Sequence, residues 1–165
     1  GIHSNGLSLA RKVFFDDNRF NVEDKLPTDP ETSVGEELLK PTIIYVNPIV
    51  ELLKSDVEVH GLAHITGGGF TNLKRLKKGI GYIIETLPEP QTIFKAMHTL
   101  GVPLEELYRV FNMGIGFVVI VKSEDADKTI NIIKKFNLAY KIGRANDDHR
   151  EKVKITTFKE CIINL

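Results

Sequence analysis

The sequence has few of the residues and segments that are typical of secreted or membrane proteins. It contains no tryptophan, two methionines and a single cysteine, Cys161, among its 165 residues. One cysteine excludes an intrachain disulfide and a cysteine-rich zinc site, and it favours a reducing, intracellular, cytoplasmic location. The longest fully apolar run, 117–121, is far shorter than the roughly 18 residues that a membrane-spanning helix needs. We therefore expect no membrane association.

An excess of charge is also lacking, since 22 Lys and Arg balance 22 Asp and Glu. A dedicated nucleic-acid binder usually has a basic excess, so we expect no nucleic-acid partner. The five histidines are scattered without a metal-binding helical spacing, and we predict no metal site in this chain. The length suits one domain, 1–165. Because the chain begins at Gly1 rather than at a methionine, we expect a processed chain or a piece of a longer protein.

Hydrophobic periodicity predicts alternating helices and strands. The expected helices are 7–15, 46–53, 70–78, 90–100, 104–111 and 126–136, and the expected strands are 42–46, 57–66, 79–86, 115–121, 139–144 and 153–158. The polar, proline-containing segment 16–36 reads mostly as loop. This alternation predicts an α/β (α+β) fold with helices packed on a sheet. The strand 115–121 is apolar on both faces and is expected at the centre, covered on both sides.

The first of three glycine-bearing motifs is Gly1-Ile-His-Ser-Asn-Gly6, which leads into a predicted helix. The N-terminus of a helix has unpaired N–H groups and the positive end of the helix dipole, which suit a phosphate or carboxylate. His3, Ser4 and Asn5 add further donors. The alternative interpretation is an ordinary helix N-cap formed by Ser4 or Asn5.

The second motif, 61–69, ends in Gly67-Gly68-Gly69 after a predicted strand. Glycines lose more chain entropy on folding than other residues, so three in a row suggest a sharp turn or a close approach of backbone to a ligand, as in a phosphate nest. The alternative is a tight turn without a ligand. The segment is not a P-loop, because no Lys-Ser or Lys-Thr follows the glycines at the required spacing.

Strand alternation places the side chains of this motif on two faces. His64 and Thr66 point away from the face that carries Ala63 and Ile65, so they could reach a pocket outside the core. A histidine that only bonds a neighbouring carbonyl is the alternative.

The third motif, 111–116, joins a predicted helix to the most apolar strand. Gly114 is well placed as a helix C-cap. Asn112 could contact a ligand or could simply satisfy the end of the helix, and the motif alone leaves both interpretations open.

The three motifs in this order resemble the C-terminal half of the aminoimidazole ribonucleotide synthetase family, also called phosphoribosylformylglycinamidine cyclo-ligases. The His64-Ile-Thr-Gly-Gly-Gly69 form separates this family from its superfamily relatives. The resemblance covers nearly the whole chain and includes 9–12, 35–39, 44–46, 109–116 and 139–143. It implies a three-layer helix, mixed sheet, helix domain with partial ferredoxin-like topology. The sequence departs from the family at 70–75, where the segment after the glycines is shorter than usual.

The resemblance implies an enzyme of de novo purine synthesis that uses ATP and Mg²⁺ to close the imidazole ring of formylglycinamidine ribonucleotide. His64 and His3 are then the catalytic candidates, for proton transfer or for polarising an oxygen. The candidates for binding substrate or phosphate are Ser4, Asn5, Gly6, Thr66, Gly67, Gly68, Gly69, Asn112 and Gly114.

The family enzyme has two halves with the site between them, and it forms homodimers. Its nucleotide-binding loop and acidic metal ligands belong mainly to the N-terminal half, which this chain lacks, so we expect the isolated chain to be inactive. Two alternatives stay open: another ATP-dependent synthetase or kinase of the superfamily, and a non-catalytic module that kept the fold.

Overall fold

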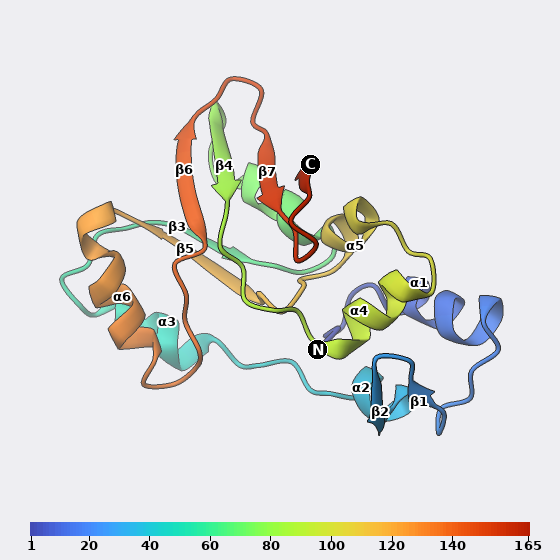
Figure 1. Cartoon of the computed structure of the whole chain (residues 1–165). Helices are drawn as coiled ribbons and strands as arrows, with labels where there is room; N and C mark the ends of the chain where they lie inside the picture. Colours follow the sequence, from blue (N-terminus) through green and yellow to red (C-terminus); the bar gives the residue numbers. More distant parts are fainter.

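A computed structural model describes all residues, 1–165, and divides them into short helices and strands (Figure 1). The helical segments are α1 (Leu7–Arg11), the π-helix η1 (Lys12–Asp17), α2 (Val34–Leu38), α3 (Val46–Leu53), the 3₁₀ helix η2 (Gly69–Arg75), α4 (Thr92–Thr99), α5 (Leu104–Val110), η3 (Ser123–Asp125) and α6 (Ala126–Ile133). The strands are β1 (Lys25–Leu26), β2 (Asp29–Ser33), β3 (Val59–His64), β4 (Ile80–Ile84), β5 (Phe117–Val121), β6 (Gly143–Asp147), β7 (Val153–Thr156) and β8 (Ile162–Asn164).

The expected α/β (α+β) class is confirmed, and the strands form three small sheets. β1 and β2 form a hairpin, and β3 pairs antiparallel with β5, so that His64 lies opposite Phe117. The third sheet has the order β6-β4-β7-β8 and is mixed, because β4 runs antiparallel to β6 and parallel to β7. Figure 1 shows this sheet above the β3–β5 pair, with α3 and α6 at one end and α1 and α4 at the other.

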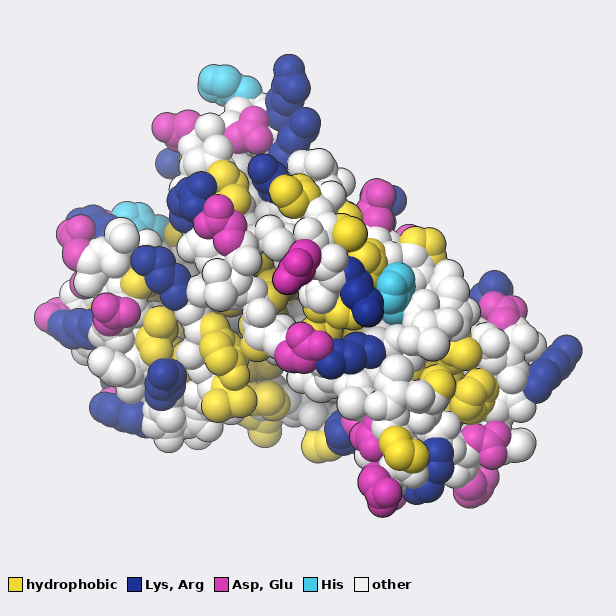
Figure 2. Space-filling model, viewed as in Figure 1, with side chains coloured by type: hydrophobic (Ala, Val, Ile, Leu, Met, Phe, Trp, Pro, Cys, Tyr) yellow, Lys and Arg dark blue, Asp and Glu magenta, His cyan; other side chains and the backbone are white.

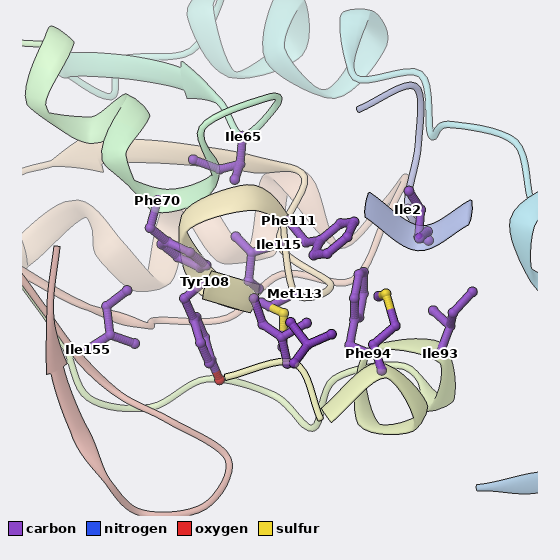
Figure 3. Close-up of a cluster of buried hydrophobic side chains, with 14 of the residues drawn as sticks. Ile2, Ile65, Phe70, Ile93, Phe94, Tyr108, Phe111, Met113, Ile115 and Ile155 are labelled. Carbon is purple, nitrogen blue, oxygen red and sulfur yellow. The ribbon is translucent and has the colours of Figure 1, made fainter. Parts of the chain in front are cut away.

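The main hydrophobic core lies beside α4 and α5 (Figure 3). The predicted face of α4 is there, with Ile93, Phe94 and Met97 fully buried. Phe94 and Phe111 pack with ring centroids 5.7 Å apart. Aromatic pairs of this kind contribute about 0.5–1.5 kcal/mol beyond the area that they bury. The core therefore fixes the end of α5, and with it the segment that carries the third motif.

The segment 16–36, expected to be mostly loop, contains β1, β2 and the start of α2. Ser33 and Glu36 form a capping box, in which the Ser33 hydroxyl accepts from the Glu36 N–H (3.2 Å) and the Glu36 carboxylate accepts from the Ser33 N–H (2.7 Å). This box satisfies two N–H groups that a helix end otherwise leaves unpaired, which explains why α2 begins here.

Three other predictions differ from the structure. The predicted strand 42–46 is an extended connection without a sheet partner, and it leads into α3. The strand β6 covers the predicted turn around Asn146, so that the turn lies at 148–152, and β8 was not predicted. The strand β5 pairs with β3 alone and is mostly half-buried rather than covered on both faces.

The apolar residues of α3 lie largely at the surface. Val46, Val50 and Leu53 are 63%, 41% and 55% exposed, although their spacing predicts a core face. A wide cleft of about 1440 Å³ lies between β5, α6 and β4, and most of its lining residues are hydrophobic. Figure 2 shows hydrophobic side chains gathered in the hollow at the middle of this view. None of the helices has the length and apolar character required to cross a membrane.

Candidate functional site

The three predicted motifs come together in the fold. Asn112 is 4% exposed, and its amide nitrogen donates to the Gly1 carbonyl at 3.0 Å. Its amide oxygen accepts from the Gly114 N–H at 2.7 Å. One side chain thereby joins the first and third motifs across 111 positions of sequence.

The second motif meets the first at Asn5. A Cβ added to Gly67 would lie 3.0 Å from the Asn5 side-chain oxygen, so the glycine loop passes directly beside this amide. A small hollow at the junction is formed by residues of all three motifs and of α5. It is lined by Ile2, His3, Asn5, Ile65, Thr66, Val110, Phe111 and Asn112. The three motifs, far apart in the sequence, therefore meet at one junction of the structure.

The glycine loop adopts a conformation that favours glycine. Gly68 and Gly69 have φ angles of +97° and +50°, in the left-handed region. A side chain at Gly69 would also overlap the Tyr108 carbonyl. Neither Gly67 nor Gly68 donates its N–H to another group of the chain, whereas the Gly69 N–H donates to the Thr66 carbonyl at 2.9 Å. Two adjacent free N–H groups are what a phosphate nest requires.

Asn72 holds this loop in place, although no role was predicted for it from the sequence. Its side chain is almost fully buried, and its amide nitrogen donates to the Gly69 carbonyl at 2.9 Å and to the Gly67 carbonyl at 3.3 Å. Thr71 supports the same turn by donating from its hydroxyl to the Gly68 carbonyl at 2.5 Å. The position of Asn72, three residues after the glycine triplet, could have predicted this role, because asparagine side chains commonly form hydrogen bonds with nearby backbone groups.

His64 stands at the end of β3 on the face opposite the core. Ala63 and Ile65 are buried, His64 is exposed and Thr66 is half-buried, as strand alternation predicts. The His64 ring stacks on Phe117 with centroids 5.8 Å apart and an interplanar angle of 25°. Tyr45 meets His64 edge-on at 5.6 Å. The imidazole is thus oriented by two aromatic rings, and Tyr45 is a neighbour that sequence reasoning missed.

His3 belongs to the same cluster. Burial lowers the pKa of its imidazole, and the positive charges of the Gly1 amino terminus and of His64 lower it further. The lowered pKa favours the neutral ring, which can accept or donate a proton near pH 7. His3 also has a φ of +64°, uncommon for a residue with a side chain.

Two predicted cap roles are wrong. The N-cap of α1 is Gly6, at φ +80°, and no side chain caps this helix, so neither Ser4 nor Asn5 acts as its N-cap. Ser4 is exposed. Gly114 does not cap α5, which ends at Val110 with an extended Phe111 after it. Gly114 instead occupies the turn that Asn112 closes, at φ +91°. Gly6 therefore caps a helix through its backbone alone, whereas Gly114 serves a tight turn rather than a helix end.

Comparison with known families identifies the family of the domain that contains this junction. Residues 1–156 match the family model described as AIR synthase related protein, C-terminal domain. The chain belongs to this family. The match spans nearly all of the described fold and includes all three motifs of the junction.

Two curated relatives of this AIR synthase related domain carry the same name. The chain is 55% identical over 159 residues to phosphoribosylformylglycinamidine cyclo-ligase of Methanobrevibacter smithii, covering 96% of this chain and 46% of the relative. It is 57% identical over 147 residues to the protein of that name from Methanothermobacter thermautotrophicus, covering 89% and 43%. The chain therefore spans about half the length of the curated relatives it matches.

Solved structures support the fold of the domain. A chain of the HypE-HypF complex superposes with a TM-score of 0.59 at 21% identity, covering 88% of this chain and 50% of that one. HypE of E. coli superposes with a TM-score of 0.59 at 17% identity, covering 90% and 45%. At this level of identity the likeness concerns the fold alone.

Proposed function

We propose that this chain is the C-terminal half of an ATP-dependent cyclo-ligase that converts formylglycinamidine ribonucleotide to aminoimidazole ribonucleotide in purine biosynthesis. The observation that carries the proposal is the convergence of the three motifs on one junction, in a chain more than half identical to cyclo-ligases. In the reaction the γ-phosphoryl group of ATP would pass to the amide oxygen, giving ADP. The neighbouring nitrogen would then form the ring carbon–nitrogen bond as the carbon–oxygen bond breaks and that oxygen leaves in phosphate.

The junction has the donors that a phosphorylated substrate requires. The free N–H groups of Gly67 and Gly68 would hold phosphate oxygens, with Thr66 and the Asn5 amide beside them. Such a site needs no surplus of lysines, which agrees with the zero net charge. Gly6, Asn112 and Gly114 would act mainly by shaping the junction, and Ser4, which is exposed, would contact substrate only at its edge.

His3 and His64 would perform the proton chemistry. Ring closure requires that the amide oxygen be activated and that a proton leave the attacking nitrogen. A neutral His3 could accept that proton, and His64, held between Tyr45 and Phe117, could polarise the oxygen. Catalysis of this kind depends mostly on positioning and on stabilising charge.

The donor set of the junction does not suit Mg²⁺. Hard divalent cations prefer carboxylate and carbonyl oxygens, whereas this junction offers N–H groups, amides and imidazoles. The chain has no group of three or more His, Cys, Asp or Glu arranged to hold a metal ion. We propose that the metal ligands lie mainly in the other half of the enzyme.

That other half is also the proposed partner. The exposed apolar residues of α3 and the wide apolar cleft offer surface that a partner domain would cover. A homodimer of the intact enzyme would form largely through the N-terminal half.

An activity assay tests the proposal. This chain joined to its own N-terminal half should release ADP and form the aminoimidazole only when formylglycinamidine ribonucleotide, ATP and Mg²⁺ are all present. The chain alone should be inactive. ADP release that depends on a different substrate would favour another superfamily enzyme, and no turnover with any candidate substrate would favour a non-catalytic module.

Replacement of His64 tests its role in the joined enzyme. We expect His64→Ala to lower kcat by about 100-fold or more, the usual range for a general acid or base. His60→Ala is the matched control, because His60 lies on the same strand and is equally exposed at the surface. Normal turnover by His64→Ala would remove this histidine from the catalytic machinery.

A further inference from the structure

Tyr45 lies at the junction, although none of the three motifs contains it. It is the last residue before α3 and comes from the extended connection after α2. Its ring is half-buried and packs against Phe117 with centroids 5.4 Å apart and against His64 at 5.6 Å. A residue from the middle of the chain is thereby placed against a predicted catalytic side chain.

Gly116 leaves room for the Tyr45 side chain because it has no Cβ. A Cβ added to Gly116 would overlap the Tyr45 hydroxyl and would lie 2.7 Å from the ring carbon that carries it. The same Cβ would lie 3.0 Å from Cε1 of His3. Gly116 is not among the glycines with positive φ, so its backbone would accept alanine. The contact with Tyr45 is therefore what requires glycine, and the hydroxyl lies over Gly116 beside the His3 ring.

The Tyr45 hydroxyl makes no hydrogen bond to any group of the chain, unlike that of Tyr108, which accepts from the Phe158 N–H at 3.2 Å. Burial raises the pKa of Tyr45, so the hydroxyl keeps its proton at neutral pH and can donate. Tyr45, Gly116 and Phe117 also line the wide cleft. The hydroxyl thus lies where the cleft reaches the two histidines, and it is free to donate to a ligand there.

We propose that Tyr45 is a substrate-positioning residue, whose hydroxyl donates a hydrogen bond to an anionic oxygen of a phosphorylated substrate beside His3 and whose ring orients His64. This proposal rests on the proposed function for the identity of the substrate. The placement of the ring and of the hydroxyl rests on the contacts with Gly116, His64 and Phe117 alone.

Steady-state kinetics of the joined enzyme tests the role of the hydroxyl. Tyr45→Phe keeps the ring and should raise KM for formylglycinamidine ribonucleotide about tenfold, as expected for loss of a hydrogen bond to a charged group. Tyr45→Leu also removes the aromatic contact with His64 and should lower kcat as well. Tyr140→Phe, an exposed tyrosine on the cleft wall, is the control and should stay within about twofold. An unchanged KM in Tyr45→Phe would overturn the role in substrate binding.

An NMR double-mutant cycle on this chain tests the placement without any activity. Gly116→Ala should displace Tyr45 and thereby shift the ring-proton signals of His64. In a Tyr45→Ala background the same change should leave the His64 signals nearly unmoved, because the added methyl then meets no ring that contacts His64. The His3 signals serve only as a control for the substitution, because the added Cβ lies 3.0 Å from the His3 ring in either background. Equal shifts of the His64 signals in both backgrounds would overturn the placement. An inactive wild-type enzyme would contradict both the proposed function and the role of Tyr45 in binding substrate. The NMR double-mutant cycle would still show whether Tyr45 lies against Gly116 and His64.

Discussion

Apolar residues are buried beside the motif junction, whereas many are exposed at the α3–α6 end of the molecule. Beside the junction, Phe94 and Phe111 are essentially fully buried. At the other end, which comprises α3, α6 and the segment 136–140, Leu53 is 55% exposed and Leu138 is 81% exposed. Both regions show the amphipathic spacing that predicts a buried helix face.

This difference shows what an amphipathic pattern specifies. The pattern indicates that one face of a helix will be covered, but not which element covers it. For α4 the cover includes α5 and β1. For α3 the contact with α6 covers only part of the face, since Leu52 is fully buried while its neighbours are not. These exposed apolar residues of α3 are the surface that the proposed partner domain would cover.

Truncation of a core aromatic should give the largest difference between the two regions. We expect Phe94→Ala to cost about 3–5 kcal/mol of unfolding free energy, because it leaves a cavity against Phe111. Leu53→Ala, the matched truncation on α3, should change stability by less than about 0.5 kcal/mol. Urea denaturation of both variants measures the comparison. Similar losses at the two positions would show that α3 is packed more tightly than its exposure indicates.

A substitution in the glycine loop should lower the free energy of unfolding nearly as much as Phe94→Ala. Gly69→Ala places a side chain at φ +50° and against the Tyr108 carbonyl, so we expect a cost of about 3 kcal/mol from combined strain and overpacking. Gly101→Ala is the control, because Gly101 has a φ of +101° but nothing within 4 Å of an added Cβ. It should lose only about 1 kcal/mol, from backbone strain. Thermal unfolding compares the two, and equal losses would argue against the close contact.

The junction was more predictable than the rest of the fold, for a physical reason. Its glycines are required by local constraints, such as the positive φ of Gly68 and Gly69, and these leave a clear sequence signal. The alternation that turns His64 away from the core is equally local. Tyr45 left a weaker signal, because its role depends on contacts with His64 and Phe117, which only the fold brings near. The contacts of Asn72 are local, but an asparagine after a glycine turn has several possible backbone partners.

The sheets were less predictable because strand pairing is not local. The segment 42–46 is rich in β-branched residues, yet no strand lies beside it, so it stays an extended connection. The residues around Asn146 read as a polar turn after a strand over 139–144, yet they belong to β6, because β4 supplies a partner for every residue of 143–147. β-propensity reflects such neighbours more than any intrinsic backbone preference.

Protonation of His3 at the junction should change the free energy of unfolding by less than the substitutions above. The folded-state pKa of His3 is lowered, so the unfolded chain binds the proton more tightly. Stability should therefore rise with pH between that lowered pKa and 6.5, the unfolded value of His3. His3→Gln should flatten this window. The buried Gly1 amino terminus, whose pKa is lowered from 8.0, should give a further rise above pH 6.5 that His3→Gln does not remove. The carboxylates with lowered pKa, such as Glu36, act only below about pH 4.5 and do not interfere. A wild-type curve that is flat up to pH 6.5 would contradict the burial of His3.

Polar substitution on α3 should have the smallest effect on stability. Val46→Thr, Val50→Thr and Leu53→Gln replace exposed apolar groups, so each should change the unfolding free energy by no more than about 0.5 kcal/mol. The same triple variant should bind less of a hydrophobic dye and should associate more weakly with the proposed N-terminal half, measured by calorimetry. A polar triple on α4 could not serve as such a probe, because it would unfold the chain. Stability lost on α3, with association unchanged, would mean that this face already belongs to the core and that the partner binds elsewhere.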